Sequence, residues 1–215
     1  MYHCLLIPAL LMTADALSPG DHTRKVQVAA ASREYFLHIP KEYDGKKAWP
    51  VVLVFHGGAS NAEQMVRFCG LSAKADKAGF IAVYPSGSGK LPRISTWNAG
   101  NCCGYAMSQK IDDVAFVRAI LDDLETAGAI DKSRIYATGM SNGGIMAYLL
   151  ASELSDRIAA IAPVSGPMGT ETCGPKRPVS VMHFHGTADE FAPYKGGKGS
   201  KPLSGTQFYS VEHSI

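Results

Sequence analysis

The chain has 215 residues, of which 46% are hydrophobic and 19% are charged. This length accommodates one α/β domain or at most two, and the composition is too apolar for an intrinsically disordered chain. The formal net charge is +2, and lysine and arginine form no dense run, so the composition gives no indication of nucleic-acid binding.

The N-terminal sequence, MYHCLLIPALLMTADALSPG, has the pattern of a secretory signal. Residues 4–12 form an apolar run that is too short to span a bilayer, and Ala14-Asp15-Ala16 has the small-x-small pattern of a signal-peptidase site. We therefore expect residues 1–17 to be a signal peptide, residues 18–215 to be a single domain, and the protein to be secreted or periplasmic. Against this, no lysine or arginine precedes the apolar run, and the alternative is a frayed terminus or an apolar N-terminal strand.

Short apolar segments predict the strands of a central sheet. Residues 33–39 (REYFLHI) alternate between polar and apolar side chains, as in a half-buried strand. Residues 51–55 (VVLVF) form the continuous apolar run that is typical of a central parallel strand. Four further strands are predicted at residues 80–84, 134–138, 158–164 and 179–184.

Helices are predicted over residues 62–78 and 112–127, and a third follows residue 141. In the second, apolar residues form one face, and Asp112 or Asp113 at its start is favourable because negative charge stabilises a helix N-terminus. Repeated strand–helix units predict a mostly parallel sheet with right-handed crossovers and helices on both faces.

Ser141 is the candidate nucleophile, because it is the central residue of a Gly-x-Ser-x-Gly segment at 139–143. Small residues two positions away on either side allow a sharp turn that exposes the serine hydroxyl and directs the next helix N-terminus at the reacting carbonyl. The alternative is a glycine-rich loop with an N-capping serine, but the apolar run before and the helical pattern after favour a nucleophile. Ser165 also follows a predicted strand but lacks the flanking glycines.

The sequence His56-Gly57-Gly58 follows the predicted strand at 51–55. Ligands bind beyond the carboxyl ends of the strands in such a sheet, and glycines let backbone N–H groups approach them closely. We therefore predict an oxyanion hole formed by Gly57 and Gly58, with the N–H of Asn142 as the second donor. The alternative is an ordinary tight turn. His56 is interpreted as organising the loop rather than as a base.

Asp189 is the candidate acid of a catalytic triad. It follows the predicted strand at 179–184, and the order of serine before aspartate suits such a triad. The alternatives are a capping aspartate in a loop, or Glu190 as the acid. His183 and His185 alternate on one strand and so point to the same side, which suggests a metal site, but no third ligand lies at a suitable spacing. Neither a metal nor a cofactor is expected.

If Cys4 leaves with the signal peptide, four cysteines remain: Cys69, Cys102, Cys103 and Cys173. Adjacent cysteines do not easily bond to each other, so we expect Cys102 and Cys103 each to have a distant partner. The sequence does not choose among the possible pairings, and the alternative is four buried, reduced thiols. Their spacing does not indicate a zinc site.

Taken together, seven segments of the chain resemble the secreted polyhydroxybutyrate depolymerase and feruloyl esterase-like family of α/β-hydrolases. They run in order through residues 33–194: FHGGASNAEQM, GFIAVYPSG, WNAGNCCG, IDDVAFVRAILDDL, RIYATGMSNGG, IAAIAPVSG and HFHGTADEFAPY. The resemblance implies an α/β-hydrolase fold. It also implies cleavage of carboxylic esters, either of hydroxybutyrate oligomers or of hydroxycinnamate and acetyl groups on plant polysaccharide. The expected partner is thus an ester substrate, with no nucleic acid and no membrane.

The resemblance also implies roles for individual residues. Ser141 is then the nucleophile, Asp189 is the acid, and the loop at 56–58 with Asn142 is the oxyanion hole. His56, Trp97 and Asn98 are expected to contact substrate, with the adjacent cysteines near the substrate entrance.

The resemblance does not extend to the base histidine. In the family this residue follows one further helix and strand, whereas here residues 195–205 (KGGKGSKPLSG) are predicted to form a mobile surface loop and the final FYSVEHSI resembles the start of a helix. His213 on that helix is a weak candidate. We therefore expect the last strand, the last helix and the base histidine to be missing. Three functions remain open: a serine esterase with an acyl-enzyme, a catalytically silent or binding-only relative, and a serine peptidase or acyltransferase.

Overall fold

The computed structural model describes residues 15–91, 93–201 and 204–215. The predicted signal peptide therefore lies outside the described residues except for its last three positions. Of these, Leu17 packs against the main hydrophobic core, and its N–H donates to the carbonyl of Ala127 at 2.9 Å.

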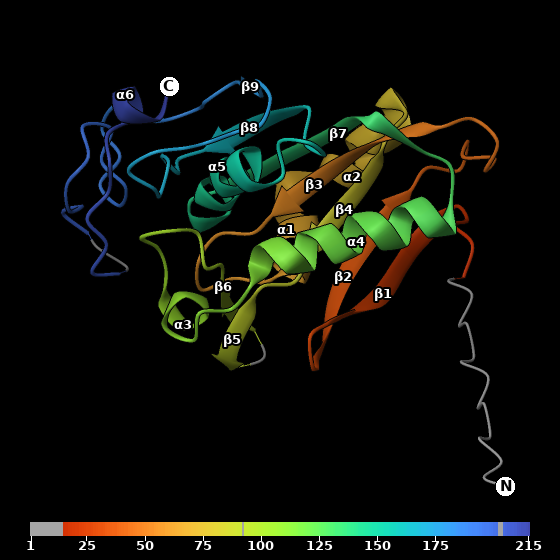
Figure 1. Cartoon of the computed structure of the whole chain (residues 1–215), viewed down its shortest axis with the longest axis horizontal. Coiled ribbons are helices and arrows are strands. Elements are labelled where there is room, and N and C mark those ends of the chain that lie inside the picture. The colour runs from red at the N-terminus through yellow and green to blue at the C-terminus, as the bar shows by residue number, and fades with distance from the viewer. Residues whose placement is uncertain (1–14, 92, 202–203) are drawn as a thin grey trace, which may run out of the picture.

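The centre of the molecule is a seven-stranded sheet in the order β1-β2-β4-β3-β7-β8-β9 (Figure 1). The pairs β1–β2 and β2–β4 are antiparallel and all other pairs are parallel. A separate hairpin pairs β5 with β6. The strands are β1 Gly20–Val28, β2 Ala31–Ile39, β3 Trp49–Phe55, β4 Ile81–Pro85, β5 Ser88–Leu91, β6 Ile94–Thr96, β7 Ile130–Met140, β8 Ala160–Val164 and β9 Ser180–Val181.

Helices cover both faces of the sheet, as the sequence predicts. Along β3, Leu53 and Phe55 enter the larger hydrophobic cluster while Val54 enters the smaller one, because successive side chains of a strand point to opposite faces. The helices α4 (Asp113–Ala127) and α5 (Asn142–Glu153) complete the larger cluster, and α4 crosses in front of the strands in Figure 1. The helices α1 (Ala62–Cys69) and α2 (Leu71–Ala78) cover the smaller cluster.

Two short helices lie outside these layers, α3 (Gly104–Ser108) and α6 (Val211–Ser214). The helix predicted over residues 112–127, with Asp112 or Asp113 at its start, is confirmed as α4. Asp112 is its N-cap, because the Asp112 side chain accepts the N–H of Ala115 at 2.8 Å, and Asp113 is its first residue. No helix within the described ranges has the length and apolar character needed to cross a membrane.

The prediction of one helix over residues 62–78 is wrong. The chain forms two helices that meet at Gly70, whose φ of 63° lies in the left-handed region. A glycine adopts this conformation without steric cost and ends a helix there, although the apolar pattern continues across it.

The prediction and the structure differ most at the two sides of the sheet. Only Ser180–Val181 of the predicted strand 179–184 pairs continuously with β8, and a single further bridge joins Phe184 to Val164. Within the described part of the chain, residues 179–184 have a neighbouring strand on one side only, which is β8. Fewer backbone hydrogen bonds therefore hold these residues in strand geometry. At the opposite side, β1 was missed because its many charged and polar side chains hide its alternation.

Candidate active site

Ser141 occupies a sharp turn between β7 and α5. Its φ of 54° and ψ of −121° lie in a region that non-glycine residues rarely adopt. The N–H of Ser141 donates to Val164 O at 2.8 Å, and its carbonyl accepts the N–H of Ile145 at 3.0 Å. The neighbouring strand and the first turn of the helix thus hold the strained backbone in place.

Glycines make this turn possible. A Cβ atom on Gly139 would overlap the carbonyl of Gly143, and one on Gly143 would overlap the carbonyl of Phe55. Gly166, after β8, lies equally close to the carbonyl of Ser141. The sequence indicated the first two through the flanking pattern, whereas Gly166 carried no local signal, since its constraint comes from a neighbouring strand.

The predicted oxyanion loop lies beside this turn. A Cβ atom on Gly57 would be 3.8 Å from the Cβ of Ser141, and one on Gly58 would be 3.7 Å from the Cβ of Asn142. The N–H of Asn142 belongs to the first turn of α5, where N–H groups have no acceptor within the helix. The structure therefore brings together Ser141 and the three residues predicted to receive an oxyanion.

His56 is fully buried behind this loop. Its Nε2 accepts the N–H of Gly87 at 3.0 Å, so the ring proton is on Nδ1, which donates to the carbonyl of Gly57 at 2.7 Å. Burial lowers the pKa of His56 to about 4, so the ring is neutral. These bonds agree with the interpretation of His56 as a loop-organising residue, and its burial leaves no surface for the predicted substrate contact.

Trp97 is also fully buried and joins the loop to the serine turn. Its indole N–H donates to the carbonyl of His56 at 2.9 Å. Its backbone N–H donates to Asn142 Oδ1 at 2.7 Å, and its carbonyl accepts Asn142 Nδ2 at 3.1 Å. The side chain of Asn142 therefore clamps the backbone of Trp97, so both residues support the site from behind.

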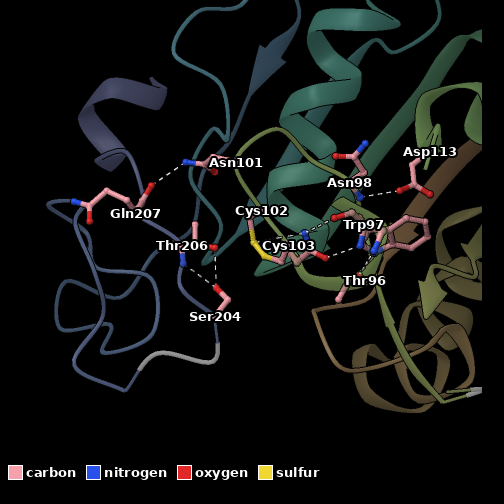
Figure 2. The surroundings of a disulfide bond; sticks show 12 residues. Thr96, Trp97, Asn98, Asn101, Cys102, Cys103, Asp113, Ser204, Thr206 and Gln207 are labelled. Atoms are coloured by element: carbon pink, nitrogen blue, oxygen red, sulfur yellow. Dashed lines mark hydrogen bonds between the residues drawn. A yellow bond between two sulfur atoms is a disulfide. The ribbon is translucent and has the colours of Figure 1, made fainter. Parts of the chain in front are cut away.

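Asn98 continues this support. Its backbone N–H donates to Asp113 Oδ2 at 2.8 Å, as Figure 2 shows, and its side-chain Nδ2 donates to the carbonyl of Ile111 at 2.9 Å. Asp113 also accepts Arg33 Nη1 at 2.7 Å. Burial raises the pKa of Asp113, and the Arg33 guanidinium opposes this shift. The side-chain amide of Asn98 is used for loop structure rather than being directed at Ser141.

A cavity of about 120 Å³ lies at Ser141 and Asn142. Gly58 forms part of its wall, in keeping with the predicted oxyanion loop. The remaining wall is largely apolar, with contributions from Ala59, Cys102, Cys103, Phe191, Ala192 and Phe208. Such a cavity, apolar with a few polar groups beside a nucleophile, suits the acyl part of an ester.

The structure joins Cys102 and Cys103 to each other as a disulfide in the wall of this cavity (Figure 2). The expectation of distant partners for these cysteines is therefore wrong. The other two described cysteines, Cys69 and Cys173, are free thiols. Cys69 packs against the smaller hydrophobic cluster on the other face of the sheet, and Cys173 is exposed. Cys4 lies outside the described residues.

Asp189 closes a turn at the edge of the cavity. Its Oδ1 accepts the N–H groups of Phe191 at 2.8 Å and Ala192 at 2.9 Å, and both residues contribute to the cavity wall. Its Oδ2 lies 3.6 Å from His185 Nε2. The alternative acid, Glu190, is exposed and forms an ion pair with Lys201. The geometry thus favours Asp189 over Glu190 as a residue of the site.

No histidine in the described ranges hydrogen-bonds to Ser141. His213 is exposed on the short helix α6, as expected from the sequence. Its Nε2 lies 3.4 Å from the carbonyl of Thr170, and its ring stacks on Tyr209 with centroids 4.5 Å apart. The described residues therefore place a serine beside backbone donors, and none of the described histidines is hydrogen-bonded to that serine.

Comparison with known proteins decides the family. Residues 34–195 match the family described as esterase PHB depolymerase. The chain belongs to this family of carboxylic ester hydrolases. This finding agrees with the resemblance seen in the sequence.

Two relatives are named as esterases, a feruloyl esterase and an acetylxylan esterase/xylanase. Feruloyl esterase B of Piromyces equi is 32% identical over 77% of this chain and 31% of its own length. The bifunctional acetylxylan esterase/xylanase of Neocallimastix patriciarum is 32% identical over 79% of this chain and 23% of its own length. The chain thus spans less than a third of each of these relatives.

Solved structures show the same fold. The acetyl xylan esterase from Aspergillus awamori superposes with a TM-score of 0.56 at 15% identity, covering 69% of this chain and 53% of the other. At this identity the likeness establishes the fold alone, and the predicted α/β-hydrolase fold is confirmed.

Proposed function

We propose that this chain carries the acyl-enzyme site of a serine ester hydrolase. Ser141 attacks the ester carbonyl, and the N–H of Asn142 together with the Gly57–Gly58 loop receives the resulting oxyanion. The alcohol leaves, and water then hydrolyses the acyl-enzyme. The observation that carries the proposal is the strained Ser141 turn, which opens into an apolar cavity beside Gly58 and Asn142.

Asp189 is proposed as the acid that would orient the base. This role is supported by the turn that Asp189 closes, which contributes Phe191 and Ala192 to the cavity wall. A base histidine has to reach both Ser141 and Asp189, and none of the described histidines does so. Loss of the base from a triad can cost about a millionfold in kcat, so we expect negligible ester turnover by the 215-residue chain.

We propose short or phenolic esters attached to polymers as the substrates. The support is the apolar cavity wall, which includes Phe191 and Phe208, and the relatives named as feruloyl and acetylxylan esterases. Secretion, proposed from the N-terminal sequence, would give access to such polymers.

A second candidate function is binding without catalysis. It is favoured by one observation, the absence of a histidine bonded to Ser141 in the described ranges. Such a protein would keep the cavity and hold ester ligands without turning them over.

The test is covalent labelling of the full chain with a fluorophosphonate, read by intact mass, alongside turnover of 4-nitrophenyl acetate and methyl ferulate. We expect slow labelling that Ser141→Ala abolishes, because Ser141 alone occupies the strained, glycine-flanked turn. Ser165→Ala is the matched control and should label like wild type. Ser165 also has positive φ, but it lacks the glycines two positions away on either side.

Three outcomes would count against the proposal. Loss of labelling in Ser165→Ala but not in Ser141→Ala would move the nucleophile. Binding of methyl ferulate without any labelling would favour the second candidate function. Cleavage of a peptide amide without ester turnover would favour a peptidase.

A further inference from the structure

A chain of hydrogen bonds connects α5 to the turn that Asp189 closes. Tyr148 Oη lies 2.9 Å from His183 Nδ1, and His183 Nε2 lies 3.0 Å from His185 Nδ1. His185 Nε2 lies 2.7 Å from the carbonyl of Ala192. The planes of the two imidazole rings are nearly parallel, with an angle of 13° between them, and the His185 side chain is only 1% exposed.

The last acceptor in this series of hydrogen bonds, the carbonyl of Ala192, fixes the direction of every bond. The carbonyl of Ala192 can only accept, so His185 Nε2 carries a proton. In a neutral ring His185 Nδ1 is then an acceptor, and it receives the Nε2–H of His183. His183 Nδ1 is in turn an acceptor for the hydroxyl of Tyr148. Each of the two rings thus donates once and accepts once without carrying charge.

The surroundings favour this neutral form. Burial, and secondarily the neighbouring His185, lower the pKa of His183. Burial raises the pKa of Tyr148, so its hydroxyl keeps its proton. The other titratable groups in contact with His185 are Asp189, with Oδ2 at 3.6 Å, and Tyr194, whose ring centroid is 6.0 Å away.

The series of hydrogen bonds joins the helix that follows Ser141 to the turn that contains Asp189. A catalytic triad requires these two parts of the structure to keep a fixed relative position. Tyr148 is on α5, the helix that begins directly after Ser141. Ala192 is in the turn that Asp189 closes with its Oδ1, and it is part of the cavity wall. A shift of this turn would move both the carboxylate and the wall.

We propose that His185, supported by His183, is a positioning residue for the esterase site. It holds the turn at 189–192 to the helix behind Ser141, so that the Asp189 carboxylate keeps its place. The role for Asp189 rests on the proposed function, whereas the hydrogen-bond chain does not.

The first readout is nitrogen-detected NMR of histidine side chains in the full chain at neutral pH. We expect His183 and His185 both to be protonated at Nε2 and free at Nδ1. A proton on Nδ1 of either ring at neutral pH would overturn the proposal. This readout uses wild-type protein, so it stands even if a variant fails to fold.

The second readout compares His185→Leu with His185→Gln. Leucine removes both bonds, whereas glutamine can accept from His183 and donate to the carbonyl of Ala192. We expect amide hydrogen exchange at Phe191 and Ala192 to speed up by roughly tenfold or more in His185→Leu and to be largely restored in His185→Gln. His22→Leu, which removes a histidine bonded only to Ser18 O, is the matched control and should leave this exchange unchanged. Unchanged exchange in His185→Leu would contradict the proposal.

Labelling of Ser141 separates this inference from the proposed function. If wild type reacts with the fluorophosphonate, His185→Leu should react up to roughly a hundredfold more slowly, because the displaced turn carries Phe191 and Ala192 of the cavity wall and misplacement can cost rates of that order. His185→Gln should recover most of the rate, and equal rates in all three proteins would contradict a positioning role. If wild type does not react, the proposed function fails, while the NMR and exchange results still decide whether His185 holds the turn.

Discussion

His56 should make the free energy of unfolding depend on pH. Burial lowers its pKa to about 4 from the ordinary 6.5, so below pH 6.5 the unfolded chain binds a proton that the folded chain does not. The contribution is thus complete above pH 6.5 and is lost as the pH falls from 6.5 to 4. By linkage the loss reaches roughly 3 kcal/mol. Urea denaturation at pH 7 and pH 4.5 should show a smaller decrease for His56→Gln than for wild type.

His38 provides a control of opposite sign. Burial lowers its pKa, but hydrogen bonds to Asp21 at 2.6 Å and Asp76 at 3.0 Å outweigh burial and raise the pKa overall. Its contribution is therefore present at low pH and is lost as the pH rises through its folded-state pKa. His38→Gln should make the decrease between pH 7 and pH 4.5 larger than in wild type. An identical pH dependence in His56→Gln and wild type would rule out a role for His56.

Single residues of the site were predictable where the signal was local. Ser141, Asp189 and the Gly57–Gly58 loop each follow an apolar run. The structure places Ser141 directly after β7 and the loop directly beyond β3, whereas Asp189 comes several residues after the short strand β9. The clamp between Asn142 and Trp97 joins positions 45 residues apart and depends on backbone groups, which every residue carries. No sequence pattern could therefore have indicated it.

At the scale of elements, the order of strands and helices could be predicted from the sequence, whereas the positions where individual helices and strands end were harder to predict. The central strands β3 and β4 are largely buried and therefore show continuous apolar runs. The side strands β1 and β9 have fewer buried positions, which weakens the pattern on which a prediction depends. The break between α1 and α2 arises from the backbone conformation of Gly70 and not from hydrophobicity.

Gly70 is therefore expected to be required for the break. A Cβ atom at this position would meet nothing within 4 Å, so Gly70→Ala tests backbone conformation alone. We expect a loss of about 1 kcal/mol, since a non-glycine residue pays this cost at positive φ. Gly174→Ala is the matched control, because it also has open space but no positive φ, and it should be neutral or stabilising by about 0.5 kcal/mol. Equal effects in urea denaturation would show that φ at Gly70 does not matter.

At the scale of the whole molecule, the two edges of the sheet differ in the polarity of their exposed side chains. The β1 side carries polar and charged side chains. The β9 side exposes large apolar ones, which we call the β9 patch: Val164 at 36%, Val181 at 43%, Met182 at 65% and Phe184 at 50% exposure. The helices α1 and α2 contact β2, β3 and β4, and they do not extend over β9. A sheet edge that exposes large apolar side chains favours association with other molecules.

The β9 patch should therefore bind hydrophobic dyes and promote self-association of the folded chain. We expect the chain to enhance anilinonaphthalene sulfonate fluorescence, and its sedimentation coefficient to increase with concentration. The double variant Met182→Thr/Phe184→Ser should lower both effects, because it removes the two most exposed apolar side chains of the patch. Leu91→Ser is the matched control, since Leu91 is 57% exposed on the separate β5–β6 hairpin. If Leu91→Ser lowered both signals as much as the double variant, general surface hydrophobicity would explain them and the β9 patch would have no special role.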